Sequence, residues 1–382
     1  ELKNPLTDST YASFEPALDY VVVKFPRWPF DKFKQADRKL GTKMKATGEV
    51  MAIDRNLEAA LQKAVASLEL KTSGTHLPEL GGVSSEVLWK LLETPDDRRF
   101  FAVMELLSRG TSISEIHEKT KIDDYFLHVF SNIIQLENTL MEQGDSLSVS
   151  LLKKVKEKGF TDFTIASLTG KTEEEVRALR KKMGIAASFK IVDTCAAEFD
   201  AKTNYFYSTY FGKSDGDISQ KTKKRALIIG SGPIRIGQGV EFDYSAVHGV
   251  MTLKSLGFET IMLNNNPETV STDYEMADRL YFEPITPEHI LNVAEAEDID
   301  FAIVQFGGQS AINVAQAIEK AGITLLGTSS ETLDILEDRD QFYQLLDELG
   351  ISHAKGETAS SKAEAVKKAN EIGYPVLIRP SY

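Results

Sequence analysis

The sequence has little cysteine: Cys195 is the single one among 382 residues. One thiol excludes a disulfide within the chain, which is typical of proteins from a reducing cytoplasm, the location we expect. The histidines are scattered without the spacing of zinc ligands, so we predict no metal site in this sequence. No apolar run approaches the roughly 20 residues that span a bilayer, and the first residues lack a signal-peptide pattern. We therefore expect no membrane partner.

Basic residues are also in the minority. Lys and Arg number 44 against 57 Asp and Glu, a net charge of −13. This balance argues against nucleic acid as the main partner of the surface. It leaves a nucleotide site open, because a local phosphate site needs only a few donors. The length predicts two or three domains, and no internal repeat is visible.

Both ends of the sequence are unusual. It begins with Glu1 rather than Met, and its last residues, VLIRPSY, have the pattern of a buried strand. Natural domains seldom stop within such a strand, so we expect the sequence to be a piece of a longer protein.

The first two segments differ in pattern. Residues 1–70 contain a predicted strand at 19–25, ended by Pro26, and then a helix with an apolar face. They resemble the tail of a domain whose body lies upstream. Residues 71–218 are predicted to be helical, with Leu152 and Val155 on an apolar stripe and a capping box between Thr172 and Glu175. This segment has no glycine-rich loop, and we interpret it as a bundle for spacing or association.

Residues 219–382 alternate short apolar strands with amphipathic helices. We predict strands at ALII (226–229), TIML (260–263), FAIV (301–304), TLLG (324–327) and PVLIR (375–379). This alternation predicts a doubly wound parallel sheet. The fold class expected for the whole chain is therefore α/β plus all-α.

The stretch GSGPIRIGQG, at 230–239, follows the first of these strands and precedes a helix. A strand, a glycine-rich turn and a helix N-terminus form an anion site. However, the dinucleotide fingerprint fits only Gly230 and Gly232, since Gly237 comes two positions late and no acid follows the second strand. The P-loop needs a lysine where Gln238 stands. Both cofactor interpretations are therefore disfavoured.

Two further polar stretches follow strands of the same segment, NNNPETVSTD (264–273) and QFGGQ (305–309). Each one alone could be a tight turn. Three in succession should meet at one edge of a parallel sheet, where such folds bind ligands. The candidate substrate residues at this edge are Gly230, Gly232, Gly237, Gly239, Asn266, Glu268, Gly307, Gly308 and Gln309.

The residues resemble one family over essentially the whole chain. Five stretches are similar to the second synthetase half of carbamoyl phosphate synthetase large subunits: GPIRIGQGVEFDYSAVHG, NNNPETVSTDYEMADRLYFEP, VQFGGQ, EDRDQF and YPVLIRPSY. ASFEPALDYVVVKFPRWPFDKF and KMKATGEVMAI resemble the end of the first half. LLKKVKEKGF, VDTCAAEF and YFYSTY resemble the helical oligomerisation domain between the halves.

The resemblance implies an organisation and a reaction. Residues 1–70 would be the tail of the first ATP-grasp half, 71–218 the oligomerisation domain, 219–335 a pre-ATP-grasp domain, and 336–382 the beginning of the second ATP-grasp domain. The first half phosphorylates bicarbonate with ATP, and ammonia then gives carbamate, which the second half phosphorylates with another ATP. Ammonia comes from a glutaminase small subunit, and the product feeds pyrimidine and arginine synthesis.

The resemblance also implies ATP ligands. Two arginines of the family match Arg339 and Arg379, and a guanidinium offers fixed donors for phosphate. Mg²⁺ or Mn²⁺ and K⁺ assist in the family, but the metal ligands and the phosphate-covering glycines would lie outside this chain. We therefore expect both active sites to be incomplete here, and the chain alone to be inactive.

Three alternatives remain at this point. Another ATP-grasp ligase, such as a biotin carboxylase or a purine-pathway ligase, would lack the helical insert with VDTCAAEF. A helix-turn-helix DNA-binding module could lie in residues 151–190, which hold ten basic against five acidic residues. Cys195 could be proposed as a nucleophile, but no histidine is near it in sequence, and we assign it no chemistry.

Overall fold

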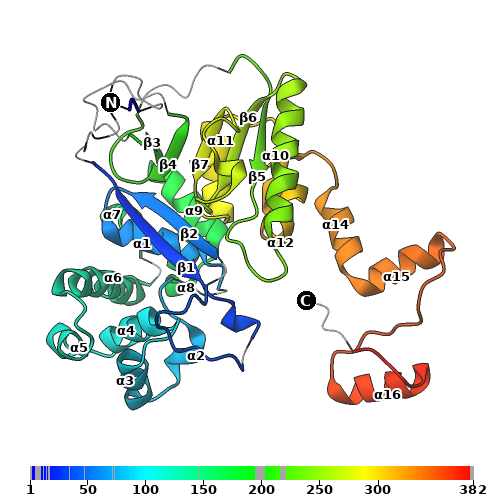
Figure 1. Cartoon of the computed structure of the whole chain (residues 1–382), viewed down its shortest axis with the longest axis horizontal. Coiled ribbons are helices and arrows are strands. Elements are labelled where there is room, and N and C mark those ends of the chain that lie inside the picture. Colours follow the sequence, from blue (N-terminus) through cyan, green and yellow to red (C-terminus); the bar gives the residue numbers. More distant parts are fainter. Residues whose placement is uncertain are drawn as a thin grey trace. The chain divides into compact units, whose positions relative to one another are not determined.

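The computed structural model describes residues 2–378 except 5–9, 12, 14, 16–17, 34, 47, 71, 73, 145, 194–202 and 216–220. The chain forms two compact units, Glu1–Thr324 and Leu325–Tyr382 (Figure 1). Cys195 and Arg379 lie outside the described residues. Within the described part of the chain, no helix is both long and apolar enough to cross a membrane.

The first unit begins with a β-hairpin and a helix. β1 (Val21–Arg27) pairs antiparallel with β2 (Gly48–Asp54), and a short 3-10 helix, η1 (Pro29–Asp31), follows β1. β1 runs through Pro26, where the sequence predicted an end, because a two-stranded hairpin leaves one edge of each strand free and an edge tolerates proline. α1 (Leu57–Ser67) starts at Asn56, whose side chain accepts from the amide of Ala59 at 3.1 Å.

Eight helices then follow in the described residues between Pro78 and Lys182. They are α2 (Pro78–Gly81), α3 (Ser85–Glu93), α4 (Arg99–Ser108), α5 (Ile113–Thr120), α6 (Asp124–Gln143), α7 (Val149–Glu157), α8 (Asp162–Thr169) and α9 (Glu173–Lys182). Leu152 and Val155 are buried, as the apolar stripe predicts. The capping box is also confirmed, since the Thr172 and Glu175 side chains each accept from the other's amide.

The rest of the unit is built on one sheet, in the order β3-β4-β7-β6-β5-β8-β9 (Figure 1). The strands are β3 (Ser188–Ile191), β4 (Tyr205–Thr209), β5 (Arg225–Ile229), β6 (Glu259–Asn264), β7 (Arg279–Phe282), β8 (Phe301–Ile303) and β9 (Thr324–Leu325). Pairing is parallel from β4 to β8, and β3 joins β4 antiparallel. The connections are α10 (Val240–Ser255), η2 (Val270–Thr272), α11 (Pro287–Ala296), η3 (Gln305–Gly307), α12 (Gly308–Ile312) and α13 (Ala315–Lys320).

The predicted parallel sheet is confirmed, with additions. The strands expected at 226–229, 260–263 and 301–304 correspond to β5, β6 and β8. β3 and β4 lie within 71–218, which was predicted to be helical, and this part of that prediction is wrong. Aromatic-rich YFYST is a strand because β4 packs Tyr207 into the core and pairs with β7. The domain boundaries at 70, 218 and 335 stay predictions.

Buried charges join the helices to the sheet. Lys156, on α7, lies 2.9 Å from Asp162 on α8 and 2.6 Å from Glu288 on α11, and all three side chains are buried. Burial alone would raise the pKa of Glu288, but the neighbouring Lys156 and Arg180 are among the groups that together outweigh it and hold that pKa below its usual range. Arg180, on α9, pairs with Asp162 at 2.7 Å. A buried pair of this kind is costly to break on one side only, so these helices are held firmly against α11.

A second buried group joins α1 to the sheet. Lys63 lies 3.1 Å from Glu283, which follows β7, and Asp54 at the end of β2 accepts from the Thr209 hydroxyl at 2.7 Å. Burial raises the pKa of both Glu283 and Asp54. The hairpin and α1 are thus held on the sheet by polar groups that water does not reach.

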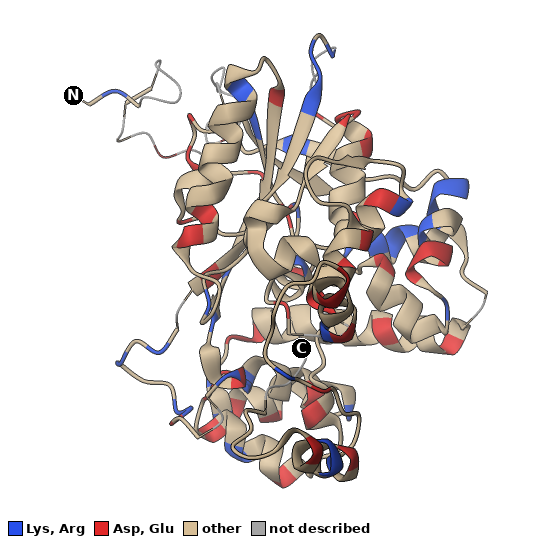
Figure 2. Ribbon diagram, turned by 90° about the vertical axis from the view of Figure 1, so that its right-hand side faces the viewer, with Lys and Arg blue, Asp and Glu red and all other residues tan. Residues whose placement is uncertain are grey.

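Several basic residues of 151–190 are paired with carboxylates of the protein. Arg177 and Lys181, on α9, pair with Glu295 of α11 at 2.5 and 2.7 Å, and Arg180 is buried against Asp162. Acidic and basic positions are interspersed along the ribbon (Figure 2). A recognition helix needs its cations free for phosphates and base edges, so this arrangement disfavours the helix-turn-helix interpretation.

The second unit contains α14 (Ser330–Glu337), α15 (Arg339–Glu348) and α16 (Lys362–Ile372). Asp338 caps α15 by accepting from the Gln341 amide at 2.9 Å, and Arg339 is its first residue. The strand predicted at 375–379 is wrong for its described part, since residues 375–378 form no strand. Leu377 and Ile378 are 93% and 81% exposed, and an apolar stretch becomes a strand only when a neighbouring strand and a core are present.

Candidate functional site

The three polar loops predicted to meet do lie together at the carboxyl edge of the sheet. The amide of Gly230, after β5, donates to the carbonyl of Leu263 in β6 at 2.8 Å. A Cβ added to Gly307, after β8, would come within 2.5 Å of the Gly230 carbonyl oxygen. The chain can pass this closely only because Gly307 carries no side chain. Residues 230–239, here called the glycine loop, therefore lie between the two other loops.

Asn264, at the end of β6, fixes the first turn of the glycine loop. Its Oδ1 accepts from the amides of Gly232 at 3.1 Å and Asn265 at 2.9 Å. Gly232 has φ +70°, a conformation that glycine adopts at little cost. A strand terminus thus sets the position of the loop beside it.

A second set of contacts ties the glycine loop to α12 and to the residues after α1. Gln238 donates to the Ser310 hydroxyl at 2.9 Å and also to the Ser231 carbonyl. Arg235 donates to Ser310 at 3.0 Å and to Oε2 of Glu69 at 2.5 Å. Because these side chains are buried or partly buried, the loop is held in one conformation by groups from three parts of the chain.

The β-hairpin packs on the same edge. Gly48, the first residue of β2, lies so close to the glycine loop that a Cβ there would overlap the Ile234 carbonyl oxygen. The amide of Met51 donates to the carbonyl of Asn265 at 2.9 Å. The hairpin therefore forms one wall of the site, although it precedes the glycine loop by about 180 residues in sequence.

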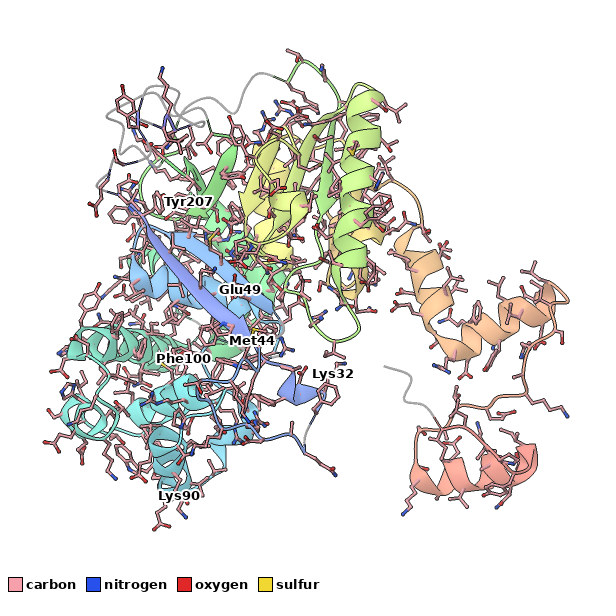
Figure 3. The ribbon with its side chains drawn as sticks, in the orientation of Figure 1. Lys32, Met44, Glu49, Lys90, Phe100 and Tyr207 are labelled. Atoms are coloured by element: carbon pink, nitrogen blue, oxygen red, sulfur yellow. The ribbon has the colours of Figure 1, made fainter. Side chains whose placement is uncertain are left out.

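An acidic pair shares one lysine across this wall. Lys24 of β1 lies 2.8 Å from Glu49 of β2 and 3.0 Å from Glu268 of the loop after β6. Glu49 is labelled in Figure 3. The hydrogen bonds from Lys24 and with Glu49 lower the pKa of the Glu268 carboxyl. Bonds to both glutamates raise the pKa of Lys24, so Lys24 and Glu268 are both charged near neutral pH.

The amides of the glycine loop are largely used within the protein. Besides Gly230 and Gly232, the amides of Arg235 and Gln238 donate to each other's carbonyl groups. The amide of Gly239, the N-cap of α10, donates to the Glu241 carboxylate at 3.2 Å. A carboxylate of the protein itself, that of Glu241, thus occupies this helix N-terminus. The loop is a rigid support for a site rather than an open phosphate cradle.

The remaining predicted residues lie less centrally. Gly237 has φ +88°, and a Cβ there would have no described atom within 4 Å. The side chain of Asn266 accepts from the Glu268 amide at 3.0 Å, which shapes its own turn. Gln309 is exposed and donates to Asn313, the C-cap of α12, at 2.9 Å. Gly308 lies against Gln238, since a Cβ on it would come within 3.1 Å of the Gln238 side chain.

Several residues of the site were not predicted from the sequence. Arg235 and Gln238 stand inside the quoted motif, and their polar side chains were the available signal. The sequence carried no such signal for Lys24, Glu49 and Glu69. Each of them lies 166 or more residues from its partner in the glycine loop or in the loop after β6. Arg339 belongs to the second unit and Arg379 is not described, so the structure leaves their role a prediction.

Three family models match the chain. The "Carbamoyl-phosphate synthetase large chain, oligomerisation domain" matches residues 49–184, and the "Carbamoyl phosphate synthase preATP-grasp domain" matches 222–335. The "Carbamoyl-phosphate synthase L chain, ATP binding domain" matches 338–382. The oligomerisation-domain and preATP-grasp matches together contain the described parts of the candidate site, apart from the hairpin strand β1, Gly48 and Arg339.

Curated relatives match along the whole chain. The chain is 82% identical over 382 residues to the carbamoyl phosphate synthase arginine-specific large chain of Bacillus subtilis (strain 168). It is 58% identical to that of Geobacillus stearothermophilus and 56% identical to that of Halalkalibacterium halodurans, each over 383 aligned residues. These matches cover all of this chain and 37% of each relative.

Solved structures show more distant likeness. The biotin carboxylase domain of a single-chain bacterial carboxylase is 18% identical with a TM-score of 0.29, covering 39% of this chain and 34% of that chain. N5-carboxyaminoimidazole ribonucleotide synthetase from Thermus thermophilus is 16% identical with a TM-score of 0.31, covering 39% and 37%.

Proposed function

Since the chain belongs to the family of carbamoyl phosphate synthetase large chains, we propose that it serves the synthesis of carbamoyl phosphate from bicarbonate, ammonia and two ATP. The chain spans 37% of the length of its curated relatives. The activity therefore belongs to a whole large chain with a glutaminase small subunit that supplies ammonia. The relatives' names favour the arginine route over pyrimidine synthesis.

The glycine loop, in this proposal, shapes the carbamate and phosphate end of the second synthetase site. The observation that carries it is the meeting of three strand-end loops around Gly230, Asn264 and Gly307. In a parallel sheet this edge is where ligands bind. Phosphoryl transfer depends mainly on positioning, and a loop whose amides and side chains are fixed by the protein can hold a small intermediate in one place.

ATP would be held mainly by the ATP-grasp part, through Arg339 and Arg379. Arg339 stands at the start of α15, partly exposed, where its guanidinium can donate to phosphate oxygens or to polar atoms of a nucleotide. For metal ions the described residues give no fit, since no group of three or more Asp, Glu, His or Cys side chains is placed to hold one. Ligands for Mg²⁺, Mn²⁺ or K⁺ would therefore come from other parts of a whole large chain.

Residues 71–218 would carry self-association, as the matched oligomerisation domain suggests. Light scattering on the purified chain tests this point: we expect a dimer or higher form, and a monomer at high protein concentration would contradict it. Another ATP-grasp ligase would not need this helical segment, and no observation favours one.

A coupled ATPase assay with bicarbonate and ammonia tests the division of labour. The 382-residue chain alone is expected to make no carbamoyl phosphate, whereas a full-length large chain of the same sequence should do so. Turnover of the chain alone well above a denatured control, or an inactive full-length chain, would contradict the proposal.

A further inference from the structure

A cavity of about 310 Å³ lies among elements from three parts of the first unit. The end of α1 and the residues after it form one wall, and the first turns of α8 and α9 form another. Thr286 and Pro287, at the start of α11, complete it. Ligand sites range from about 300 to 1,000 Å³, so this cavity is large enough for a small molecule only.

The lining combines apolar side chains with two carboxylates. Val65, Leu70 and Phe163 supply much of the apolar surface. Glu69 and Glu173 also line the cavity, and none of its described lining residues is basic. Phe163 is 51% exposed, so the cavity wall reaches the surface at this residue. An anionic ligand would meet like charges here, whereas a cation would meet opposite ones.

The protein surrounds the two carboxylates differently. Oε1 of Glu69 is buried and has no hydrogen-bond partner among the described residues, while Oε2 is held by Arg235 and Ser310. Burial raises the pKa of Glu173 to about 7, and Glu288 of α11, Asp162 of α8 and the neighbouring Glu174 add to this effect. Lys156 of α7 opposes it without cancelling it. A bound cation would supply the missing counter-charge.

We propose that this cavity binds a small organic cation, an aliphatic primary amine. Its ammonium group pairs with Glu173, whereas Oε1 of Glu69 has no surface that a ligand in the cavity could reach. Its hydrocarbon body contacts Val65, Leu70 and Phe163. The cavity is separate from the proposed carbamate site. Glu69 connects the two, because it lines the cavity and its Oε2 accepts from Arg235 of the glycine loop. An occupant therefore contacts a side chain that positions the loop.

Calorimetric titration of the 382-residue chain with n-butylammonium chloride tests the proposal directly. n-Butanol and sodium butyrate, which share the hydrocarbon body but carry no charge or the opposite charge, are the matched probes. We expect the amine to bind and the other two to bind at least about ten-fold more weakly. The amine should bind about ten-fold more tightly at about pH 8 than at about pH 6, because Glu173 must release its proton to pair with it.

Two variants locate the site. Glu173→Gln keeps the side-chain shape without the charge, and it should weaken amine binding about ten-fold. Glu86→Gln, an exposed position on α3 that does not line the cavity, should leave binding unchanged. Ala66→Phe fills the cavity from α1 and should abolish amine binding. If circular dichroism shows that Glu173→Gln does not fold, Ala66→Phe alone tests whether the amine binds in this cavity.

Three results would overturn the proposal. The first is no amine binding by the wild-type chain. The second is equal binding of butanol or butyrate, which indicates a generic apolar cavity. The third is amine binding that survives both Glu173→Gln and Ala66→Phe, which places the amine elsewhere.

Discussion

Arg235 of the glycine loop donates from Nη1 to Oε2 of Glu69 over 2.5 Å, although the two residues are 166 positions apart. Glu69 has φ +54°, which is uncommon for a residue with a side chain. The pair joins the loop after β5 to the residues after α1, and Ser310 of α12 completes the contact. The position of the glycine loop therefore depends on residues in two different family matches.

Removing the charge of Glu69 tests this connection. Glu69→Gln keeps the shape but turns a charge-assisted hydrogen bond into a neutral one. We expect a loss of about 1 kcal/mol in the free energy of unfolding, because the pair is only partly buried. Urea denaturation measures it, with the exposed Glu86→Gln on α3 as control. Equal stability of the two variants would mean that the pair does not hold the loop.

Close packing of the loops predicts a large effect at Gly307. In Gly307→Ala the new methyl group would meet the carbonyl oxygens of Gly230 and Ile229 at 2.5 and 2.6 Å. Relief of this overlap requires backbone movement, which we expect to cost about 1–3 kcal/mol of stability. Thermal unfolding measures it.

Gly81→Ala is the matched control for that substitution. A Cβ on Gly81, in α2, would have no described atom within 4 Å, and alanine favours a helix over glycine. Its stability should be unchanged or slightly higher. A Gly307→Ala protein as stable as this control would show that the three loops are not packed as described.

The buried lysine between α7 and α11 gives a third prediction. Lys156→Met removes the cation and leaves the buried carboxylates of Asp162 and Glu288 facing each other. Breaking one side of a buried ion pair costs about 3–5 kcal/mol. Lys156→Met combined with Glu288→Gln should recover part of that loss, whereas the exposed Lys154→Met should be neutral. Chemical denaturation of the three proteins decides between a buried network and a surface pair.

His289, on α11, predicts a pH dependence of stability. Burial lowers its pKa from 6.5 in the unfolded chain to about 3 in the folded one. Above pH 6.5 both states carry a neutral imidazole at this position, so its contribution is fully present there. Below that pH only the unfolded state takes up the proton, so stability falls as the pH decreases toward 3.

The size of this effect follows from one proton. The wild-type chain should lose about 1.4 kcal/mol more per pH unit than His289→Gln between about pH 4 and 6. Urea denaturation of both proteins across this range measures the difference. Parallel curves for the two proteins would contradict the assignment of a buried neutral imidazole.

Local signals predicted much of the fold, and long-range pairing explains what they did not. The alternation of apolar runs and helices located β5, β6 and β8, and the Thr172–Glu175 spacing located the start of α9. The strands β3 and β4, at one end of the sheet, were missed because β4 becomes a strand by pairing with β3 and β7. The stretch 375–379 was predicted as a strand from its apolar pattern, but its described residues 375–378 form none. An apolar pattern without a neighbouring strand is therefore not sufficient.

The candidate site follows the same rule. Glycines and asparagines at strand ends were visible in the sequence, because a parallel sheet brings such ends together. The hairpin wall with Lys24 and Glu49, and the contact of Glu69 with Arg235, arise from the packing of distant segments. No local pattern in the sequence indicates such contacts.

Gly232→Ala in a full-length large chain is the most direct test of the glycine loop's role. A methyl group there would come within 2.9 Å of Glu69 Oε1, at a residue with φ +70°. If the loop shapes the site for carbamate phosphorylation, carbamoyl phosphate formation should fall about 100-fold, as displaced catalytic geometry does. Bicarbonate-dependent ATP hydrolysis by the first half should stay near wild type. Equal loss of both reactions in a folded protein, or retention of carbamoyl phosphate formation, would contradict the proposed role.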